Sequence, residues 1–90
     1  MHFEWDASKA ARNLQKHLVS FEDASSVFWD PLAVTGDDPD HSEDEERLIT
    51  FGTSSAGQLL VVSHTEMDDT IRIISARRAT RHERQIYEEG

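Results

Sequence analysis

The sequence predicts an α+β fold with two N-terminal helices, an antiparallel sheet of about four strands and a C-terminal helix. Apolar residues first recur at helical spacing, strand-like segments then alternate with short turn-rich linkers, and a helix-capping motif follows at residues 80–83. The short linkers require antiparallel pairing, because parallel crossovers need about a dozen residues or more. Ninety residues make one domain, which we place at 1–90.

The first helix is expected to begin after Asp6, because aspartate is a good N-cap and apolar residues then follow at helical spacing. Its apolar packing stripe comprises Ala7, Ala10, Ala11, Leu14 and Leu18. Its opposite, basic face carries Lys9, Asn13 and Lys16, with Arg12 at the edge. A second, short helix is expected to follow the N-cap Ser20 and to end before Pro31, since proline disfavours helical geometry in the residue before it.

The remaining segments predict strands and a last helix. The strand candidates are Leu32–Thr35, Arg47–Thr53, Leu59–Thr65 and Thr70–Ser75. In the last of these, Ile71 and Ile73 share one face of the sheet and Arg72 lies on the other. Thr80–Glu83 has the pattern of a capping box, which predicts a final helix that extends to about Glu89.

Charge is distributed unevenly along the chain. The net charge is −9, but residues 37–46 hold seven carboxylates and no lysine or arginine, and the rest of the chain carries only −2. Residues 71–84 hold five of the seven arginines and a single carboxylate, Glu83. Guanidinium groups donate paired hydrogen bonds to phosphate and stay protonated, so this arginine-rich segment predicts a phosphate-rich ligand such as RNA or DNA.

Composition excludes several classes of protein. The chain has no cysteine, which excludes disulfides and thiolate metal sites and fits a reducing cytoplasm. It has no secretory signal and no apolar run of about 20 residues, so we expect a cytoplasmic protein without membrane contact. His41 lies within the acidic run, but that run lacks the fixed spacing of a calcium loop, and we expect neither a metal site nor a cofactor.

Two stretches of the chain carry the motifs of a known family in the family's order. The first stretch contains Phe3–Asp6, Lys9, Asn13, Lys16–His17, Val19–Glu22, Val27–Phe28 and Asp30–Pro31. The second contains Glu46–Arg47, Gly52, Leu59–Val62, Arg72–Thr80, Glu83 and Tyr87. Through these residues the chain resembles the BrnT family of type II toxins, and the likeness covers nearly its whole length.

The resemblance implies a RelE-like fold and a metal-independent endoribonuclease that arrests growth by acting on free or ribosome-associated RNA. It also implies a BrnA-like antitoxin, which neutralises the toxin and represses the shared operon, so that operator DNA is reached only through the antitoxin. The implied assembly is a heterotetramer around an antitoxin dimer. The acidic run at 37–46 then has two candidate uses: contact with a basic antitoxin surface, or screening of the arginines in the free toxin.

Two positions depart from the family pattern. The family usually has glycine after the Lys16–His17 pair, where this chain has Leu18, so the usual glycine C-cap of the first helix is missing. The hairpin after Glu66 usually reads Arg-Gly, where this chain has Met67–Asp68. Both changes affect turn geometry, and the second removes a candidate RNA-contacting arginine.

Metal-free RNA cleavage needs a base near the 2′-hydroxyl, cations on the phosphate and an acid for the 5′-oxygen. The candidate catalytic residues are Arg47, Arg72 and Arg77 as a phosphate clamp, with Glu46, His64 and Tyr87 as proton acceptors or donors. The candidate RNA-binding residues are Lys16, Arg78 and Arg81. Lys16 is also explained by its place at a helix C-terminus, where a cation favours the helix dipole.

Structural roles compete with these assignments. Arg72 would pair with a carboxylate on a neighbouring strand, such as Glu46 or Glu66, while His64 would be a strand-end histidine without a role and Tyr87 a core tyrosine. A different class of protein is open as well: a non-enzymatic module that binds protein or DNA as a co-repressor. That module predicts arginines spread along one flat face without a cleft.

Overall fold

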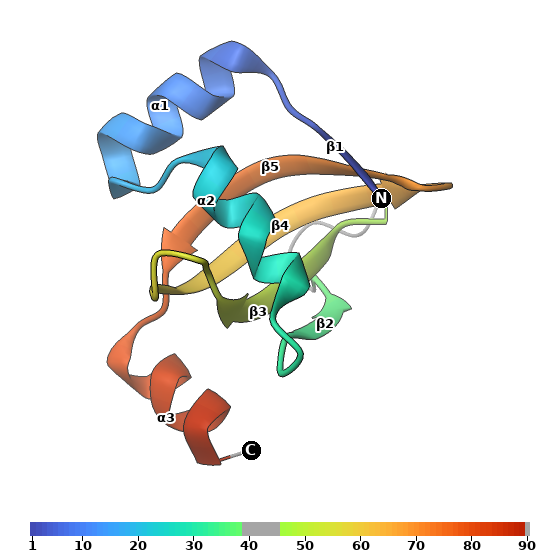
Figure 1. The fold of residues 1–90 in the computed structure, drawn as a ribbon. Coiled ribbons are helices and arrows are strands. Elements are labelled where there is room, and N and C mark those ends of the chain that lie inside the picture. Colours follow the sequence, from blue (N-terminus) through green and yellow to red (C-terminus); the bar gives the residue numbers. More distant parts are fainter. Residues whose placement is uncertain (39–45, 90) are drawn as a thin grey trace.

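The computed structural model describes residues 1–38 and 46–89, and it confirms an α+β fold (Figure 1). In chain order, the elements are β1 (His2–Glu4), α1 (Ala7–His17), α2 (Phe21–Ser26), the 3-10 turn η1 (Val27–Trp29), β2 (Val34–Asp37), β3 (Leu48–Thr53), β4 (Leu59–Met67), β5 (Thr70–Arg78) and α3 (Arg81–Glu89). Most of the acidic run, with His41, lies outside the described residues. The two predictions for that run, contact with an antitoxin surface and screening of the arginines, therefore also concern residues outside the described part of the chain.

The strands form one mixed sheet in the order β1-β5-β4-β3-β2. Strands β2 to β5 pair antiparallel as predicted, whereas β1 pairs parallel with β5. The sheet thus has five strands rather than about four, because the 3-residue β1 is too short to show a pattern in the sequence. The first predicted strand is displaced to Val34–Asp37, since Leu32 and Ala33 lie in a turn that Asp30 closes through hydrogen bonds to their backbone N–H groups.

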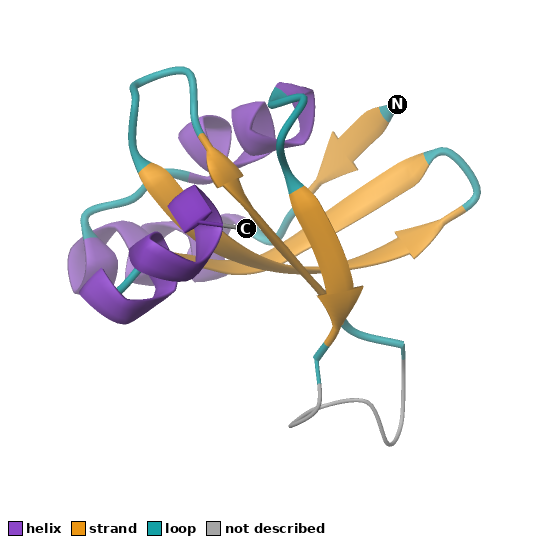
Figure 2. Cartoon of the chain, turned by 90° about the horizontal axis from the view of Figure 1, so that it is seen from below, coloured by secondary structure: helices purple, strands orange, loops and turns teal. Residues whose placement is uncertain are grey.

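Helices α1 and α2, with η1, cover one face of the sheet, and the core lies between the two layers (Figures 1 and 2). The buried core residues are Val19, Phe21, Ala24, Val27, Leu60, Val62, Ile71, Ile73 and Ala76. The opposite face carries Phe51, Val61 and Arg77 and is approached at one end by α3. We call this second face the open face.

Helix α1 docks through a different side from the predicted one. Asn13, expected on the outer face, is buried, and its amide donates to the carbonyls of Ala76 at 2.8 Å and Val19 at 3.0 Å. Its side-chain oxygen accepts from the Ala76 N–H at 3.1 Å. Within the described residues, the outer edge of β5, opposite β4, is paired only by the short β1 at Thr70–Arg72, and Asn13 takes the place of a strand beside Ala76. Leu14 and Leu18 of the predicted packing stripe are exposed instead.

The residues at the two positions where the family usually has glycine adopt a glycine-like backbone. Leu18 caps α1 at φ 60°, and its N–H donates to the carbonyl of Leu14 at 3.0 Å. Asp68 has φ 56° in the turn between β4 and β5. These are the only two non-glycine residues with positive φ in the described part of the chain. The turn geometry is therefore retained, although L-residues disfavour it.

A β-bulge in β5 changes which side chains share a face. The pairing of β4 with β5 shifts register between Ser63 and His64, which leaves Ile74 as an extra residue on β5. In a regular strand, two residues five positions apart point to opposite faces. Because of the extra residue, Arg72 and Arg77 point to the same face.

Candidate active site

Arg72 and Arg77 both lie on the open face of the sheet. Arg72 pairs with Thr65 and Arg77 pairs with Val61 across the β4–β5 ladder. Thr65 and Val61 are four residues apart on β4, so their side chains lie on one face, and the two arginines share it. The structure thus places two of the three residues of the predicted phosphate clamp on the same face of the sheet.

Arg72 pairs with a carboxylate that the sequence reasoning missed. Its Nη1 donates to Oε1 of Glu4 on β1 at 3.3 Å, so the partner is neither Glu46 nor Glu66. Both side chains are about half exposed, at 49% and 55%. They border a cavity of about 320 Å³ that is lined by Glu4, Thr65, Met67, Asp68, Thr70 and Arg72. This pair follows from the parallel pairing of β1 with β5, which the sequence did not predict.

Arg77 is held by Glu83 of α3. The two terminal nitrogens of Arg77 donate to the two carboxylate oxygens at 2.8 and 3.0 Å. Glu83 also accepts from the Thr80 N–H at 2.8 Å, and its own N–H donates to the Thr80 hydroxyl at 3.1 Å, which confirms the predicted capping box. The hydrogen bonds from Arg77 lower the pKa of Glu83 to about 2, and the same pairing raises the pKa of Arg77.

The other arginines of the segment are dispersed. Arg78 pairs with the core residue Leu60 across the β4–β5 ladder, so it does not lie on the open face with Arg72 and Arg77. Its Nε donates to the side-chain oxygen of Gln58 at 3.0 Å. Arg81 is exposed in the first turn of α3. Arg84 pairs at 3.7 Å with Glu88 one turn along the same helix. Of these three arginines, none lies with Arg72 and Arg77 in the row along β5.

Glu46 and Arg47 precede β3 at one end of the sheet. Leu48, the first residue of β3, pairs with His64, which in turn pairs with the residue that follows Arg72. Glu46 and Arg47 therefore lie at the same end of the sheet as Arg72, two strands away. Arg47 is half-buried and Glu46 is exposed.

His64 lies in the core and not beside the arginines. Its ring is fully buried, packs edge-on against Phe28 at 4.8 Å, and places Nε2 2.7 Å from the Thr50 hydroxyl. Its Nδ1 has no hydrogen-bond partner among the described residues and lies 3.7 Å from Glu66. Burial lowers the pKa of His64 to about 4, so the ring is neutral near pH 7. In this arrangement the imidazole cannot reach an RNA phosphate on the open face.

Tyr87 fastens α3 to the loop before β2. Its hydroxyl donates to Oδ2 of Asp30 at 2.6 Å, and the same oxygen accepts from the Thr53 N–H at 2.8 Å. Its ring meets Phe51 edge-on at 5.4 Å. The bonds from Thr53 and Tyr87 lower the pKa of Asp30, and the bond to Asp30 raises the pKa of Tyr87. The sequence reasoning missed Asp30 as the centre of this cluster, since its partners are distant in the chain.

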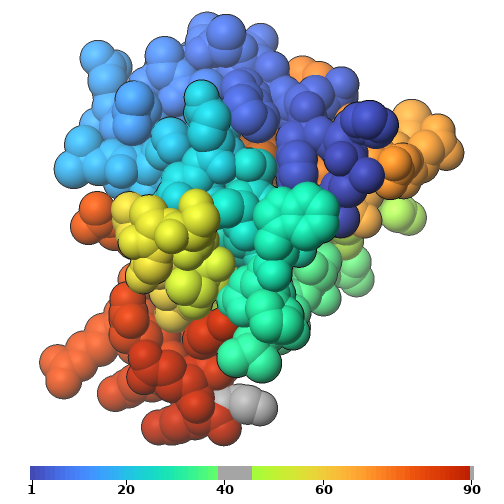
Figure 3. Space-filling model, in the orientation of Figure 1, coloured from blue at the N-terminus to red at the C-terminus, as the bar shows by residue number. Residues whose placement is uncertain are grey.

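Lys16 belongs to a basic surface on α1. A cavity of about 300 Å³ separates α1 from the bulged part of β5, and it is lined by Lys9, Arg12, Asn13, Lys16, His17, Ile74 and Ser75. Lys9 and Arg12 were not predicted to bind RNA, although their helical spacing with Lys16 places them on one side. Helices α1 and α3 lie at opposite ends of the molecule in Figure 3, yet both meet the C-terminal half of β5, since Ile74 and Ser75 line the α1 cavity and Arg77 pairs with Glu83 of α3.

Across residues 1–38 and 46–89, no three His, Asp or Glu side chains gather in a way that would hold a metal ion. In the same part of the chain, no helix has the length and apolarity needed to cross a membrane.

Comparisons with known proteins agree with this fold. The crystal structure of the Brucella abortus ribonuclease toxin BrnT superposes with a TM-score of 0.70 at 23% sequence identity, covering 90% of this chain and 99% of that chain. No curated protein sequence matches the chain. The family model described as "Ribonuclease toxin, BrnT, of type II toxin-antitoxin system" matches residues 5–83. The chain therefore belongs to the BrnT family of ribonuclease toxins of type II toxin–antitoxin systems.

Proposed function

We propose that this chain is a metal-independent endoribonuclease whose active site is the open face around Arg72 and Arg77. The observation that carries the proposal is the β-bulge, which turns the two guanidinium groups to one face of a rigid strand. Cavities border both arginines, whereas a non-enzymatic binding module predicts a flat face without a cleft. This arrangement favours the ribonuclease over the co-repressor alternative.

The proposed reaction is attack of a 2′-hydroxyl on the adjacent phosphate. The 2′ proton passes to a carboxylate, the bond to the 5′-oxygen breaks, and the products are a 2′,3′-cyclic phosphate and a 5′-hydroxyl that takes its proton from water. Arg72 and Arg77 neutralise the negative charge that grows on the phosphate oxygens. Glu4 is the proposed proton acceptor because its carboxylate lies 3.3 Å from Arg72, the proposed phosphate-binding residue, and lines the adjoining cavity.

The remaining candidate residues take different roles in this proposal. Arg47 and Glu46, at the same end of the sheet as Arg72, supply a third cation and an alternative proton acceptor. His64 and Tyr87 act structurally, because one is buried in the core and the other is bound to Asp30. Lys16 extends the RNA-binding surface along α1 with its two basic neighbours, and Arg78 and Arg81 contact flanking phosphates.

We also propose that a BrnA-like antitoxin neutralises this toxin in the cytoplasm, in a heterotetramer built around an antitoxin dimer. Membership of a type II toxin–antitoxin family supports a protein antitoxin. The antitoxin would carry the DNA-binding domain, so operator DNA is a partner only through it.

Expression of the chain alone tests the proposal. Growth arrest and fragmentation of total RNA are expected, and the purified protein is expected to cleave RNA equally well with and without EDTA. Co-expression of the cognate antitoxin should restore growth. Intact RNA with a folded protein, under conditions in which another BrnT toxin is active, would contradict the enzymatic role, and loss of cleavage in EDTA would contradict metal independence.

A further inference from the structure

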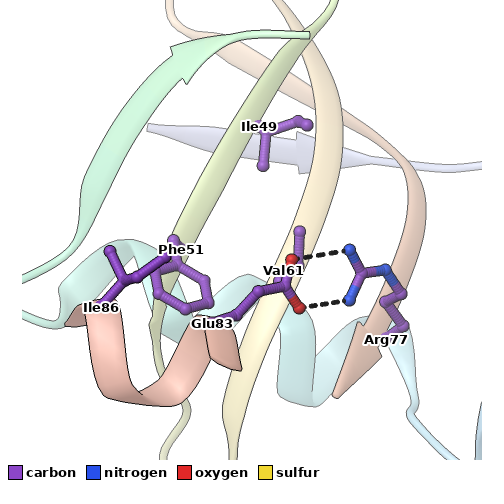
Figure 4. A pocket seen from close by; sticks show the side chains of 6 residues that line it. All are labelled: Ile49, Phe51, Val61, Arg77, Glu83 and Ile86. Carbon is purple, nitrogen blue, oxygen red and sulfur yellow. Dashed lines mark hydrogen bonds and ion pairs between the residues drawn. The ribbon is translucent and has the colours of Figure 1, made fainter. Parts of the chain in front are cut away.

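A second cavity on the open face lies directly beside Arg77. It has a volume of about 250 Å³ and is lined by Ile49, Phe51, Val61, Arg77, Glu83 and Ile86. Figure 4 shows that Ile49, Phe51 and Val61 come from neighbouring strands of the sheet, while Glu83 and Ile86 come from α3 and Arg77 from β5. The cavity therefore has an apolar floor and wall, with an ion pair on one side.

The apolar part of this cavity is held in place by neighbouring contacts. The ring of Phe51 meets Tyr87 edge-on at 5.4 Å and 88°, and Tyr87 is anchored through its hydroxyl to Asp30. Ile86 is 56% exposed, although it is a large apolar side chain beside an apolar floor. An apolar surface of this kind is suited to the flat face of an aromatic ligand.

The ion pair keeps some hydrogen-bonding capacity. Oε1 of Glu83 accepts from both Arg77 and the Thr80 N–H, whereas Oε2 accepts only from Arg77. Oε2 can therefore accept one more hydrogen bond. Arg77 has five N–H groups, of which three are used by Glu83 and the Arg78 carbonyl. One side of the cavity thus offers both a donor and an acceptor to the edge of a planar ligand.

We propose that this cavity binds the base of the nucleotide adjacent to the scissile phosphate. A nucleobase has two apolar faces and a polar edge with donors and acceptors, which matches the apolar floor and the Arg77–Glu83 side. The larger face of a purine buries more apolar surface than a pyrimidine, so the site prefers purines. This inference rests on the proposed ribonuclease function, because that function places the phosphate at Arg77.

Nuclear magnetic resonance titration of the full chain measures the contribution of the base. The probes are AMP, UMP and ribose 5-phosphate, which carries the sugar and phosphate without a base. AMP is expected to bind roughly tenfold more tightly than ribose 5-phosphate, since stacking contributes a factor of this order, with UMP between them. Equal affinity for AMP and ribose 5-phosphate would overturn the inference.

The variant Ile86→Ala tests the location of the base, and Leu32→Ala is its matched control, because Leu32 is also exposed but lies in the turn before β2. Ile86→Ala is expected to weaken AMP binding roughly threefold to tenfold by loss of apolar contact and to leave ribose 5-phosphate binding unchanged. Leu32→Ala should change neither. Unchanged AMP affinity in Ile86→Ala, with weaker antitoxin binding, would overturn the inference and assign the cavity to a protein partner.

Cleavage of RNA by the wild-type protein is measured in parallel, so that the two proposals fail separately. Tight AMP binding without cleavage would reject the ribonuclease function and support a base-binding cavity. Cleavage with no discrimination between AMP and ribose 5-phosphate would reject the cavity alone.

Discussion

Glu83 binds both terminal nitrogens of Arg77 while it caps the helix that follows, so one carboxylate joins β5 to α3. Within the described residues, α3 has no buried side chain, and its position depends on this ion pair and on the bond from Tyr87 to Asp30. The position of Arg77, and with it the geometry of the open face, is therefore coupled to α3.

Glu83→Gln should weaken the link between β5 and α3. The variant removes the negative charge that pairs with Arg77 and weakens the cap, and the free energy of unfolding should fall by about 1 kcal/mol. The pKa of Glu83 is lowered in the folded state, so its stabilisation is complete above the ordinary pKa near 4.5 and disappears as pH falls toward about 2. Urea denaturation between pH 7 and pH 3 should therefore show wild type and variant converging in acid; a constant difference would contradict this coupling.

Asn13→Ala should destabilise the protein strongly. The substitution leaves the N–H and carbonyl of Ala76 and the carbonyl of Val19 without their partner in a buried region. We expect a loss of at least about 3 kcal/mol, since each of these three unsatisfied buried groups costs about 1–3 kcal/mol. Gln15→Ala on the exposed side of α1 is the control and should change stability by less than about 0.5 kcal/mol. Equal effects of the two substitutions in thermal denaturation would show that Asn13 is not the anchor of α1.

Leu18→Gly should stabilise the protein. Leu18 has φ 60°, which is unfavourable for an L-residue and freely available to glycine. The expected gain is up to about 1 kcal/mol, reduced by the larger entropy of glycine in the unfolded chain. The same change at Leu14, inside α1, should instead destabilise by about 1 kcal/mol. Opposite signs in urea denaturation support the left-handed cap, and a loss of stability at both positions would argue against it.

Stability should fall in mild acid because of His64. Its folded-state pKa is about 4, below the ordinary value of 6.5, so between these values the unfolded chain binds the proton that the folded chain excludes. Stability is therefore highest above pH 6.5 and declines as pH falls toward 4, by about 2 kcal/mol between pH 7 and pH 5. His64→Gln should flatten this decline in urea denaturation, whereas His17→Gln, on α1, should not. An identical decline in all three proteins would assign the effect to other groups.

The sequence predicted the features that depend on neighbours along the chain. The Thr80 and Glu83 cap, the antiparallel strands β3 to β5 and the end of the second helical segment before Pro31 follow from local spacing, and the structure has them. The single helix predicted after Ser20 is divided in the structure into α2 and the 3-10 turn η1. The fold class and the family follow from these features and from the ordered motifs.

The features that the sequence did not predict depend on residues that meet only in the folded chain. Asn13 lies among basic residues in the sequence pattern and therefore has the pattern of a surface residue. Its burial could not be predicted, because its partner Ala76 lies on the edge of a strand 63 positions away. The Glu4–Arg72 pair requires the parallel strand β1, whose 3 residues carry no periodicity. The bulge at Ile74 reverses the face on which Arg77 would otherwise lie, and a pattern of alternating residues cannot show it.

Single-turnover RNA cleavage by purified variants tests most directly the proposed joint action of Arg72 and Arg77 on one face of the sheet. Arg72→Ala and Arg77→Ala are each expected to slow cleavage by roughly 100-fold or more, a typical cost for loss of one group that stabilises a transition state. The double variant should be slowed by less than the product of the two, because both arginines are proposed to stabilise the same phosphate. Arg84→Ala, which loses only a pair with Glu88, is the control and should cleave normally. Full activity in either single variant, with a folded protein, would contradict the account.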